Sequence, residues 1–303
     1  MSSVEPGLSR TIPAVRYLLL QVRNADDPMC EHEVTCFAEG LDCSVDAIVV
    51  HDLIGAAPSR DAIAEVDAVL IGGSGDYSVV EGGAWLPAAL EAMRDLHDRS
   101  IPTFASCWGF QAMAMALGGE VVTDMERAEL GTCTLELTEA GRRDPVTGPL
   151  GTPFQAQLGH QDIVDSIPDD AVLLASSERV TNEAFCFPDR LIYCTQFHPE
   201  LSRDQLLDRL RTYPKYVREI TGLDIEAFAR SCVDTPGASA LRSSSSLSVL
   251  TTVSSITAVS GFTAASGFTA LTPSSSLAAS SHHRPYALSG ESDDDESYDR
   301  DDG

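Results

Sequence analysis

A cysteine at a strand-to-helix transition is the residue of this chain best placed for chemistry. Residues 101–106 read Ile-Pro-Thr-Phe-Ala-Ser, an apolar extended run, and a helical pattern begins directly after Cys107. The unpaired N–H groups and the dipole of a helix N-terminus favour a thiolate. Cys107 is therefore a candidate nucleophile, although a cysteine taken alone is as often a small buried hydrophobic residue.

A base and a carboxylate follow downstream, where residues 196–200 read Gln-Phe-His-Pro-Glu. His198 could take the thiol proton, and Glu200 could accept a hydrogen bond from the other ring nitrogen and fix its tautomer. Because residues i and i+2 of a strand point to the same side, the two side chains can share a face. We predict that Cys107, His198 and Glu200 form a catalytic triad of nucleophile, base and orienting acid.

Four segments resemble those of the class I (triad) glutamine amidotransferases and occur in the family's order. Residues 70–76 read Leu-Ile-Gly-Gly-Ser-Gly-Asp, like the family's glycine loop, and residues 105–111 read Ala-Ser-Cys-Trp-Gly-Phe-Gln, like its Gly-x-Cys-x-Gly-x-Gln elbow. Residues 159–162 read Gly-His-Gln-Asp, similar to its Ser/Gly-His-x-Asp loop, and residues 198–200 read His-Pro-Glu. The likeness covers about residues 15–232 and is greatest to the amidotransferase domain of GMP synthase and its free-standing relatives.

The resemblance implies roles for further residues. The backbone N–H groups of Gly73 and Trp108 would form the oxyanion hole for a tetrahedral intermediate. Gln111 would support the bound glutamine, and Gly72 would line its pocket. Ala105 stands where the family has its first glycine, so a distortion of the elbow is expected there if anywhere.

His160 and Asp162 are candidates for substrate contact on the same resemblance. Their segment also reads as a turn in which an aspartate caps backbone N–H groups, so a structural role is an equal alternative. The sequence shows no His/Asp/Glu cluster with metal-ligand spacing, and residues 72–78 lack the Gly-Lys-Ser/Thr of a phosphate-binding loop. We therefore expect no metal and no cofactor.

The composition argues against several classes of protein. The 303 residues include 46 acidic and 20 basic ones, a formal charge of -26, whereas nucleic-acid binding needs a basic surface. The eight cysteines form no Cys-x-x-Cys pair, no secretory signal is visible, and no apolar run approaches the about 20 residues that span a bilayer. We expect a cytoplasmic protein with no membrane contact and no bound nucleic acid.

Apolar runs alternate with helical patterns in the first part of the chain. This alternation predicts an α/β fold, a mostly parallel sheet with helices on both faces, and the resemblance implies the flavodoxin-like fold of class I glutamine amidotransferases. Strands are expected at residues 15–22, 45–50, 68–71 and 102–106, and helices at residues 32–41, 85–97 and 108–117. Cys107 and the loop at residues 72–75 both follow such strands, where sites of parallel sheets lie.

The later part of the chain has a different pattern. Strands are expected at residues 132–138 and 190–197 within antiparallel ribbons, followed by helices at residues 202–211 and 224–231. We expect residues 1–13 to be a flexible leader and residues 14–233 to be the class I glutamine amidotransferase domain. Residues 234–303 are rich in serine and threonine and end in an acidic run, which predicts a disordered tail.

The predicted activity is hydrolysis of the L-glutamine side-chain amide to glutamate and ammonia through a γ-glutamyl thioester. The tail is too short and too polar for a synthetase domain, so any ammonia acceptor is expected on an ATP-using synthetase partner. Two alternatives remain: a γ-glutamyl peptide or amine hydrolase that uses the same triad, and a non-catalytic regulatory module of the same fold.

Overall fold

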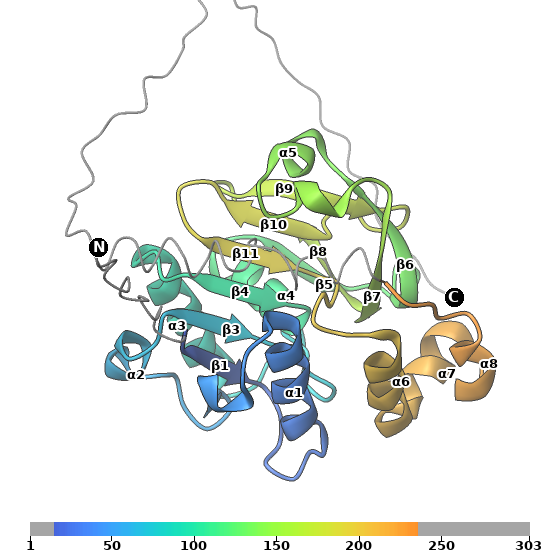
Figure 1. Cartoon of the computed structure of the whole chain (residues 1–303), viewed down its shortest axis with the longest axis horizontal. Coiled ribbons are helices and arrows are strands. Elements are labelled where there is room, and N and C mark those ends of the chain that lie inside the picture. Colours follow the sequence, from blue (N-terminus) through green and yellow to red (C-terminus); the bar gives the residue numbers. More distant parts are fainter. Residues whose placement is uncertain (1–14, 236–303) are drawn as a thin grey trace, which may run out of the picture. The chain divides into compact units, whose positions relative to one another are not determined.

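The computed structural model describes residues 15–235, and the predicted leader and the predicted tail beyond Thr235 lie outside the described residues (Figure 1). Its strands are β1 Tyr17–Gln21, β2 Ile48–Asp52, β3 Ala68–Ile71, β4 Thr103–Ser106, β5 Glu120–Thr123, β6 Glu129–Leu137, β7 Phe154–His160, β8 Asp162–Ser166, β9 Val172–Ser177, β10 Ala184–Phe187 and β11 Ile192–Thr195. Its α-helices are α1 Met29–Leu41, α2 Arg60–Ala64, α3 Leu86–Asp98, α4 Trp108–Ala116, α5 Glu139–Arg143, α6 Arg203–Thr212, α7 Pro214–Thr221 and α8 Ile225–Ala229.

The main sheet has nine strands in the order β2-β1-β3-β4-β11-β10-β9-β6-β7. The neighbours from β2 to β11 run parallel, and those from β11 to β7 run antiparallel. Strands β5 and β8 form a separate two-stranded sheet. The α/β fold class expected from the sequence is confirmed, with an antiparallel extension on one side.

Helices cover both faces of the parallel part of the sheet (Figure 1). Alternate residues of β1 enter different cores, because successive side chains of a strand point to opposite faces. Leu18 and Leu20 pack in the core that α3 and α4 share, whereas Tyr17 and Leu19 pack in the core that holds Phe37 of α1. The continuous apolar sequence of β1 thus matches its burial on both faces.

Two sequence predictions need correction. The strand expected at residues 45–50 begins only at Ile48, because the Ser44 side chain accepts a hydrogen bond from Asp46 N and caps a 3-10 turn at Val45–Ala47. The antiparallel arrangement expected for residues 190–197 holds on only one side of β11, which pairs antiparallel with β10 but parallel with β4. Every residue of β11 is buried, as in strands covered on both faces. Helices α2, α5 and α7 have no counterpart in the sequence prediction.

The parallel pairing of β4 with β11 decides which loops meet. Thr195 is the register partner of Ser106, so both strands end at the same level of the sheet. The Cys107 N–H donates to the Thr195 carbonyl at 2.8 Å, which fastens the two strand ends together. The segment that carries His198 therefore begins beside Cys107.

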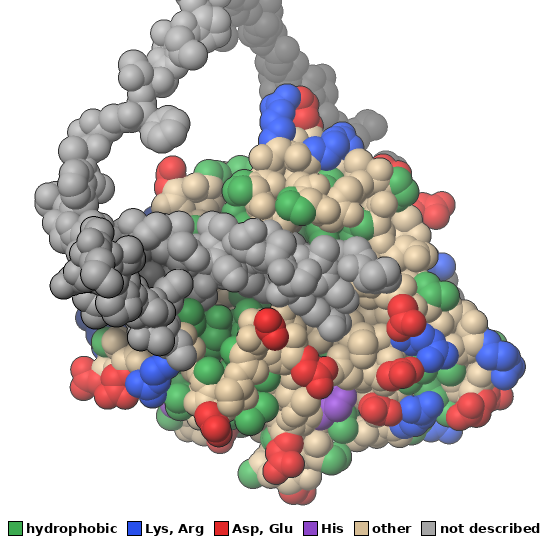
Figure 2. All heavy atoms as spheres, viewed as in Figure 1, with side chains coloured by type: hydrophobic (Ala, Val, Ile, Leu, Met, Phe, Trp, Pro, Cys, Tyr) green, Lys and Arg blue, Asp and Glu red, His purple; other side chains and the backbone are tan. Residues whose placement is uncertain are grey.

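The outer surface carries interspersed charges. Acidic and basic side chains are interspersed on the face that Figure 2 shows. Among the exposed ion pairs, Arg211 contacts Asp208 at 2.8 Å. None of the helices in residues 15–235 is long and apolar enough to cross a membrane.

Candidate active site

Cys107 lies on a sharp turn between β4 and α4. Its φ of 52° and ψ of -105° are values that residues other than glycine rarely adopt. Gly109 allows α4 to approach the sheet, because a Cβ there would lie 2.7 Å from the Ile71 carbonyl oxygen. Ala105 is fully buried and keeps regular pairing with β3 and β11, so the elbow shows no distortion at that position.

His198 and Glu200 form a buried pair beside this turn. His198 Nδ1 and Glu200 Oε1 are 2.6 Å apart, and the Ser106 hydroxyl donates to the same oxygen at 3.4 Å. Burial opposes a charge on His198, but Glu200 and Cys107 outweigh it and raise the pKa of His198 to about 9. Burial likewise opposes a charge on Glu200, yet His198 holds the pKa of that carboxyl below its ordinary value. The contact with Glu200 therefore favours the protonated form of His198.

Gly73 brings the glycine loop against both of these groups. A Cβ at Gly73 would lie 3.5 Å from the Cys107 Cβ and 3.0 Å from the His198 Cε1, so a side chain there would have to displace the imidazole. Among residues 15–235 we find no acceptor for the backbone N–H of Gly73 or of Trp108. Both donors can therefore serve a ligand next to the sulfur. The Cys107 thiol itself faces the Gly159 carbonyl oxygen at 3.7 Å.

These residues open on a pocket of about 300 Å³. Cys107, Trp108, His198 and Gly73 line it, together with the basic side chains of three residues that the sequence analysis did not single out. These are Arg23, Arg209 and Lys215. Arg23 follows β1 by two residues, so the rule that sites lie at the carboxyl ends of parallel strands could have found it. Arg209 lies within α6 and had no comparable local signal.

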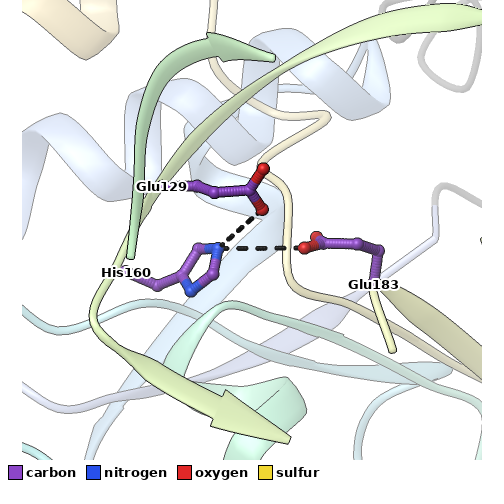
Figure 3. Close-up of side chains that lie close together, drawn as sticks. All are labelled: Glu129, His160 and Glu183. Carbon is purple, nitrogen blue, oxygen red and sulfur yellow. Dashed lines mark ion pairs between the residues drawn. The ribbon is translucent and has the colours of Figure 1, made fainter. Parts of the chain in front are cut away.

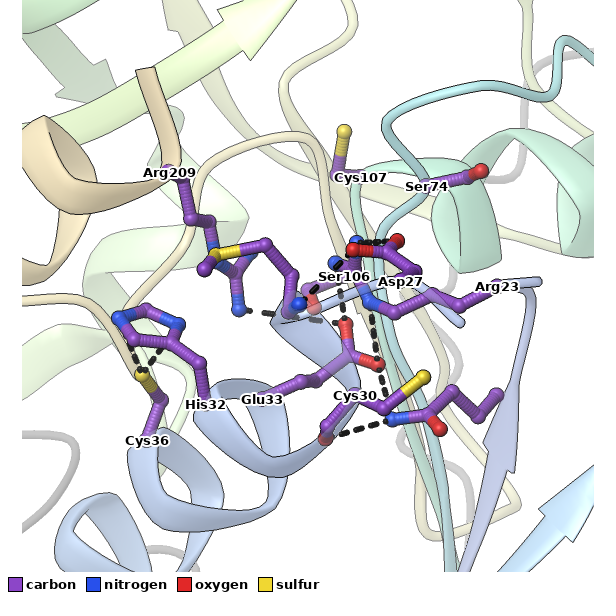
Figure 4. A network of polar contacts seen from close by, with 12 residues as sticks. Arg23, Asp27, Cys30, His32, Glu33, Cys36, Ser74, Ser106, Cys107 and Arg209 are labelled. Atoms are coloured by element: carbon purple, nitrogen blue, oxygen red, sulfur yellow. Dashed lines mark hydrogen bonds and ion pairs between the residues drawn. The ribbon is translucent and has the colours of Figure 1, made fainter. Parts of the chain in front are cut away.

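A buried ion-pair network holds Arg23 at the pocket (Figure 4). Its guanidinium donates to both oxygens of Glu33, at 3.2 and 3.1 Å, and a third nitrogen donates to Asp27 at 3.2 Å. The Tyr213 hydroxyl donates to the same Asp27 at 2.5 Å. Burial opposes the guanidinium charge, but Glu33 outweighs it and raises the pKa of Arg23. Every charge in this network has an opposite charge in contact.

Two predicted substrate contacts are held by internal hydrogen bonds. The Asp162 carboxylate accepts from the Ser78 hydroxyl at 2.5 Å and from the Thr123 hydroxyl at 2.6 Å, which ties the glycine loop to the small sheet. Gln111 donates to the Asp162 carbonyl at 3.0 Å and to the Gln196 side chain at 3.1 Å. Both residues line the pocket, and their contact with substrate stays a prediction.

The remaining two predicted contacts lie differently. Gly72 is not among the described residues that line the pocket; its carbonyl accepts from Gly109 N at 3.2 Å, and a Cβ there would collide with Glu33. His160 lines the pocket, but its Nε2 faces two buried carboxylates, Glu129 and Glu183. The substrate roles of Gly72 and His160 also stay predictions.

The sequence has no His/Asp/Glu motif with metal-ligand spacing. The fold nevertheless brings three such residues together. One ligand atom each from Glu129, His160 and Glu183 lie within 4.8 Å of one another. The three residues are far apart in sequence, and no motif connects them. Burial and the nearby Glu129 raise the pKa of Glu183 well above its ordinary value.

The sharp turn at Cys107, the buried His198–Glu200 pair and the adjacent glycine loop lie together at the carboxyl ends of parallel strands of an α/β sheet. Residues 41–207 match the family model for glutamine amidotransferase class-I. The chain belongs to this family.

Curated relatives place the chain near one branch of it. It is 30% identical over 156 residues to the GMP synthase [glutamine-hydrolyzing] of Bartonella henselae, a match that covers 52% of this chain and 28% of the relative. It is 32% identical over 134 residues to that of Salmonella typhimurium, covering 43% and 25%. The chain thus spans about a quarter of the length of the curated relatives it matches.

Solved structures share the fold. A glutamine amidotransferase from Thermotoga maritima superposes with a TM-score of 0.56 at 18% identity, covering 80% of this chain and 96% of that one. A Thermoplasma acidophilum protein, named for one of the subunits of a GMP synthase, superposes with a TM-score of 0.51 at 21% identity, covering 69% and 99%.

Proposed function

We propose that this protein hydrolyses the side-chain amide of L-glutamine to glutamate and ammonia, with Cys107 as nucleophile. The observation that carries the proposal is the elbow geometry of Cys107 next to the 2.6 Å His198–Glu200 pair. The names of the curated relatives, which include glutamine hydrolysis, support glutamine as the substrate.

The chemistry follows from the positions of the groups. The Cys107 thiolate attacks the carboxamide carbon, and the negative charge that develops on its oxygen is stabilised by the N–H groups of Gly73 and Trp108. His198, held by Glu200, gives its proton to the departing nitrogen, so ammonia leaves and a γ-glutamyl thioester remains. His198 then takes a proton from water, which attacks the thioester and releases glutamate.

Glutamate release from L-glutamine by the full chain tests this function. Cys107→Ala should abolish it, whereas Cys43→Ala, which removes a thiol in a different part of the fold, should leave it unchanged. A diazoketone analogue of glutamine should add covalently to the wild-type chain at Cys107 and not to Cys107→Ala. Activity that survives Cys107→Ala would exclude this triad, and γ-glutamyl peptides tested in parallel separate glutamine from the alternative substrate class.

We further propose that the ammonia serves an ATP-using synthetase on a partner protein. The Thermoplasma acidophilum neighbour supports this, because its name makes it one part of a GMP synthase and 99% of it matches this chain. Affinity purification of the full chain from its native cells tests the proposal. A stoichiometric ATP-binding partner that raises glutamate release is the expected result, and free hydrolysis at the same rate with no such partner would contradict it.

A further inference from the structure

The buried side chains of Glu129, His160 and Glu183 point toward one another (Figure 3). His160 Nε2 lies 3.6 Å from Glu129 Oε2 and 3.9 Å from Glu183 Oε1. The exposed fractions are 4% for His160, 7% for Glu129 and 0% for Glu183. Two carboxylates and one imidazole therefore share a site that water scarcely reaches.

The sheet holds the three residues in fixed positions. Glu129 begins β6 and His160 ends β7, and the two are direct register partners. Glu183 directly precedes β10. Its backbone N–H donates to the Ala175 carbonyl of β9, and its carbonyl accepts from the N–H of Gln196, which directly follows β11. Because two groups lie on strands and the third is hydrogen-bonded next to the start of β10, the sheet sets their spacing.

The hydrogen bond at the other ring nitrogen defines what His160 offers. Its Nδ1 lies 3.2 Å from the Asp162 carbonyl oxygen, which can only accept, so Nδ1 carries the hydrogen. Nε2 then faces the two carboxylates, yet within residues 15–235 it has no hydrogen-bond partner, and neither does either oxygen of Glu183. The separations exceed the about 2.7–3.2 Å of a hydrogen bond. The gaps between these groups leave room for one small cation that all three could contact.

We propose that Glu129, His160 and Glu183 bind one divalent first-row transition-metal ion, for which Zn²⁺ is the probe. Imidazole nitrogen and carboxylate oxygen are ligands of such ions at about 2.0–2.2 Å, which places two ligands of one tetrahedral ion about 3.3–3.6 Å apart. Two carboxylates neutralise the double charge of the ion. The second Glu183 oxygen can complete a fourth position.

The surroundings fit a metal ligand set. A ligating histidine commonly donates its other N–H to a backbone carbonyl, as His160 does to Asp162, and ligating carboxylates are themselves hydrogen-bonded. Here the Ser177 hydroxyl donates to Glu129 Oε2 at 3.0 Å. The ion would fix the end of β7, next to the Gly159 carbonyl that faces the Cys107 thiol. The proposal of a bound ion does not rest on the proposed glutamine hydrolysis.

Metal content of the full chain tests the site. After expression with added Zn²⁺ and dialysis against a weak chelator, about one zinc per chain is expected in the wild type and in Cys107→Ala. Glu183→Gln should lose the ion or bind it at least about ten-fold more weakly. Glu136→Gln, an exposed carboxylate on the same strand as Glu129, should keep it.

Substitution with Co²⁺ gives a readout on the wild-type chain that does not depend on any variant folding. Visible ligand-field absorption without a thiolate-to-cobalt charge-transfer band is expected for a site of one nitrogen and two carboxylates. A folded wild-type chain that binds no zinc would overturn the proposal and leave a shared proton as the compensating charge. Zinc kept in Glu183→Gln, or a thiolate band in the cobalt form, would also overturn it.

Discussion

Two buried histidines lie at the same end of the sheet. Each lies beside glutamate, but the number of glutamates and their distances differ. His198 meets Glu200 at 2.6 Å, a distance typical of a charge-assisted hydrogen bond. His160 lies 3.6 and 3.9 Å from its two glutamates, beyond hydrogen-bond reach. In the first pair one carboxylate meets one imidazole, and the contact raises the pKa of His198. The second set carries an excess of negative groups and needs a further positive charge.

The difference shows that residue types alone do not decide what a buried cluster does. Burying a charge is costly unless an opposite charge compensates it. At His198 one glutamate contacts one histidine, and near Arg23 each carboxylate contacts a cation. At His160 two glutamates face one histidine, so we expect a bound cation there instead of a simple His–Glu pair.

The largest expected effect separates the two histidines by function. His198→Asn should lower kcat for glutamine hydrolysis about 1,000-fold, because general acid–base transfer is lost. Its zinc content should stay at the wild-type level, since it does not touch the second cluster. Steady-state kinetics and metal analysis on the same preparation check this. Loss of zinc with retained activity would reverse the assignment.

A pH series sharpens the first half of the comparison. The pKa of His198 is raised to about 9 in the folded protein, so its stabilising contribution is full below the unfolded value of about 6.5 and is lost as pH rises through about 9. The contribution amounts to about 3 kcal/mol. The wild-type minus Glu200→Gln difference in free energy of unfolding, from urea titrations, should shrink across that range. A difference that is constant with pH would contradict the pairing.

Each of the two clusters has a serine that donates to one of its carboxylates: Ser177 to Glu129 and Ser106 to Glu200. Ser177→Ala leaves Glu129 without its 3.0 Å donor and should lower the free energy of unfolding by about 1–3 kcal/mol. Ser106→Ala removes only a 3.4 Å contact to Glu200, which keeps its bond to His198, and should cost less. Urea unfolding of both variants measures this. A loss of stability in Ser177→Ala that is no larger than that in Ser106→Ala would contradict the stronger dependence of Glu129 on its serine donor.

The smallest expected effect concerns the elbow. Ala105→Gly restores the family's glycine and should destabilise the chain by about 0.5–1 kcal/mol, because glycine is more flexible than alanine within a strand. The KM for glutamine should not change, since β4 already pairs regularly through Ala105. Thermal unfolding and kinetics check both statements. An increase in activity would reveal a strain at alanine that the backbone does not show.

The sequence predicted that Cys107, His198 and Glu200 belong to one site. It did not predict that Glu129 and Glu183 lie beside His160. Cys107, His198 and Glu200 stand in short local motifs, and the strands and helices beside them have clear periodicity. The expected strand and helix around Cys107 are confirmed as β4 and α4. Arg209 and Glu183 carry no such motif, because the contacts that define them come from elements far away along the chain.

The sequence by itself determined the alternation of strands and helices, the family, and the residues whose types suit a cysteine nucleophile. Local propensity and hydrophobic pattern act over a few residues, so they are readable in one dimension. Only the tertiary structure decided that β11 runs parallel to β4 and sets His198 beside Cys107. It also decided that β6, β7 and the start of β10 bring two glutamates to His160, because strand order and register depend on packing of the whole sheet.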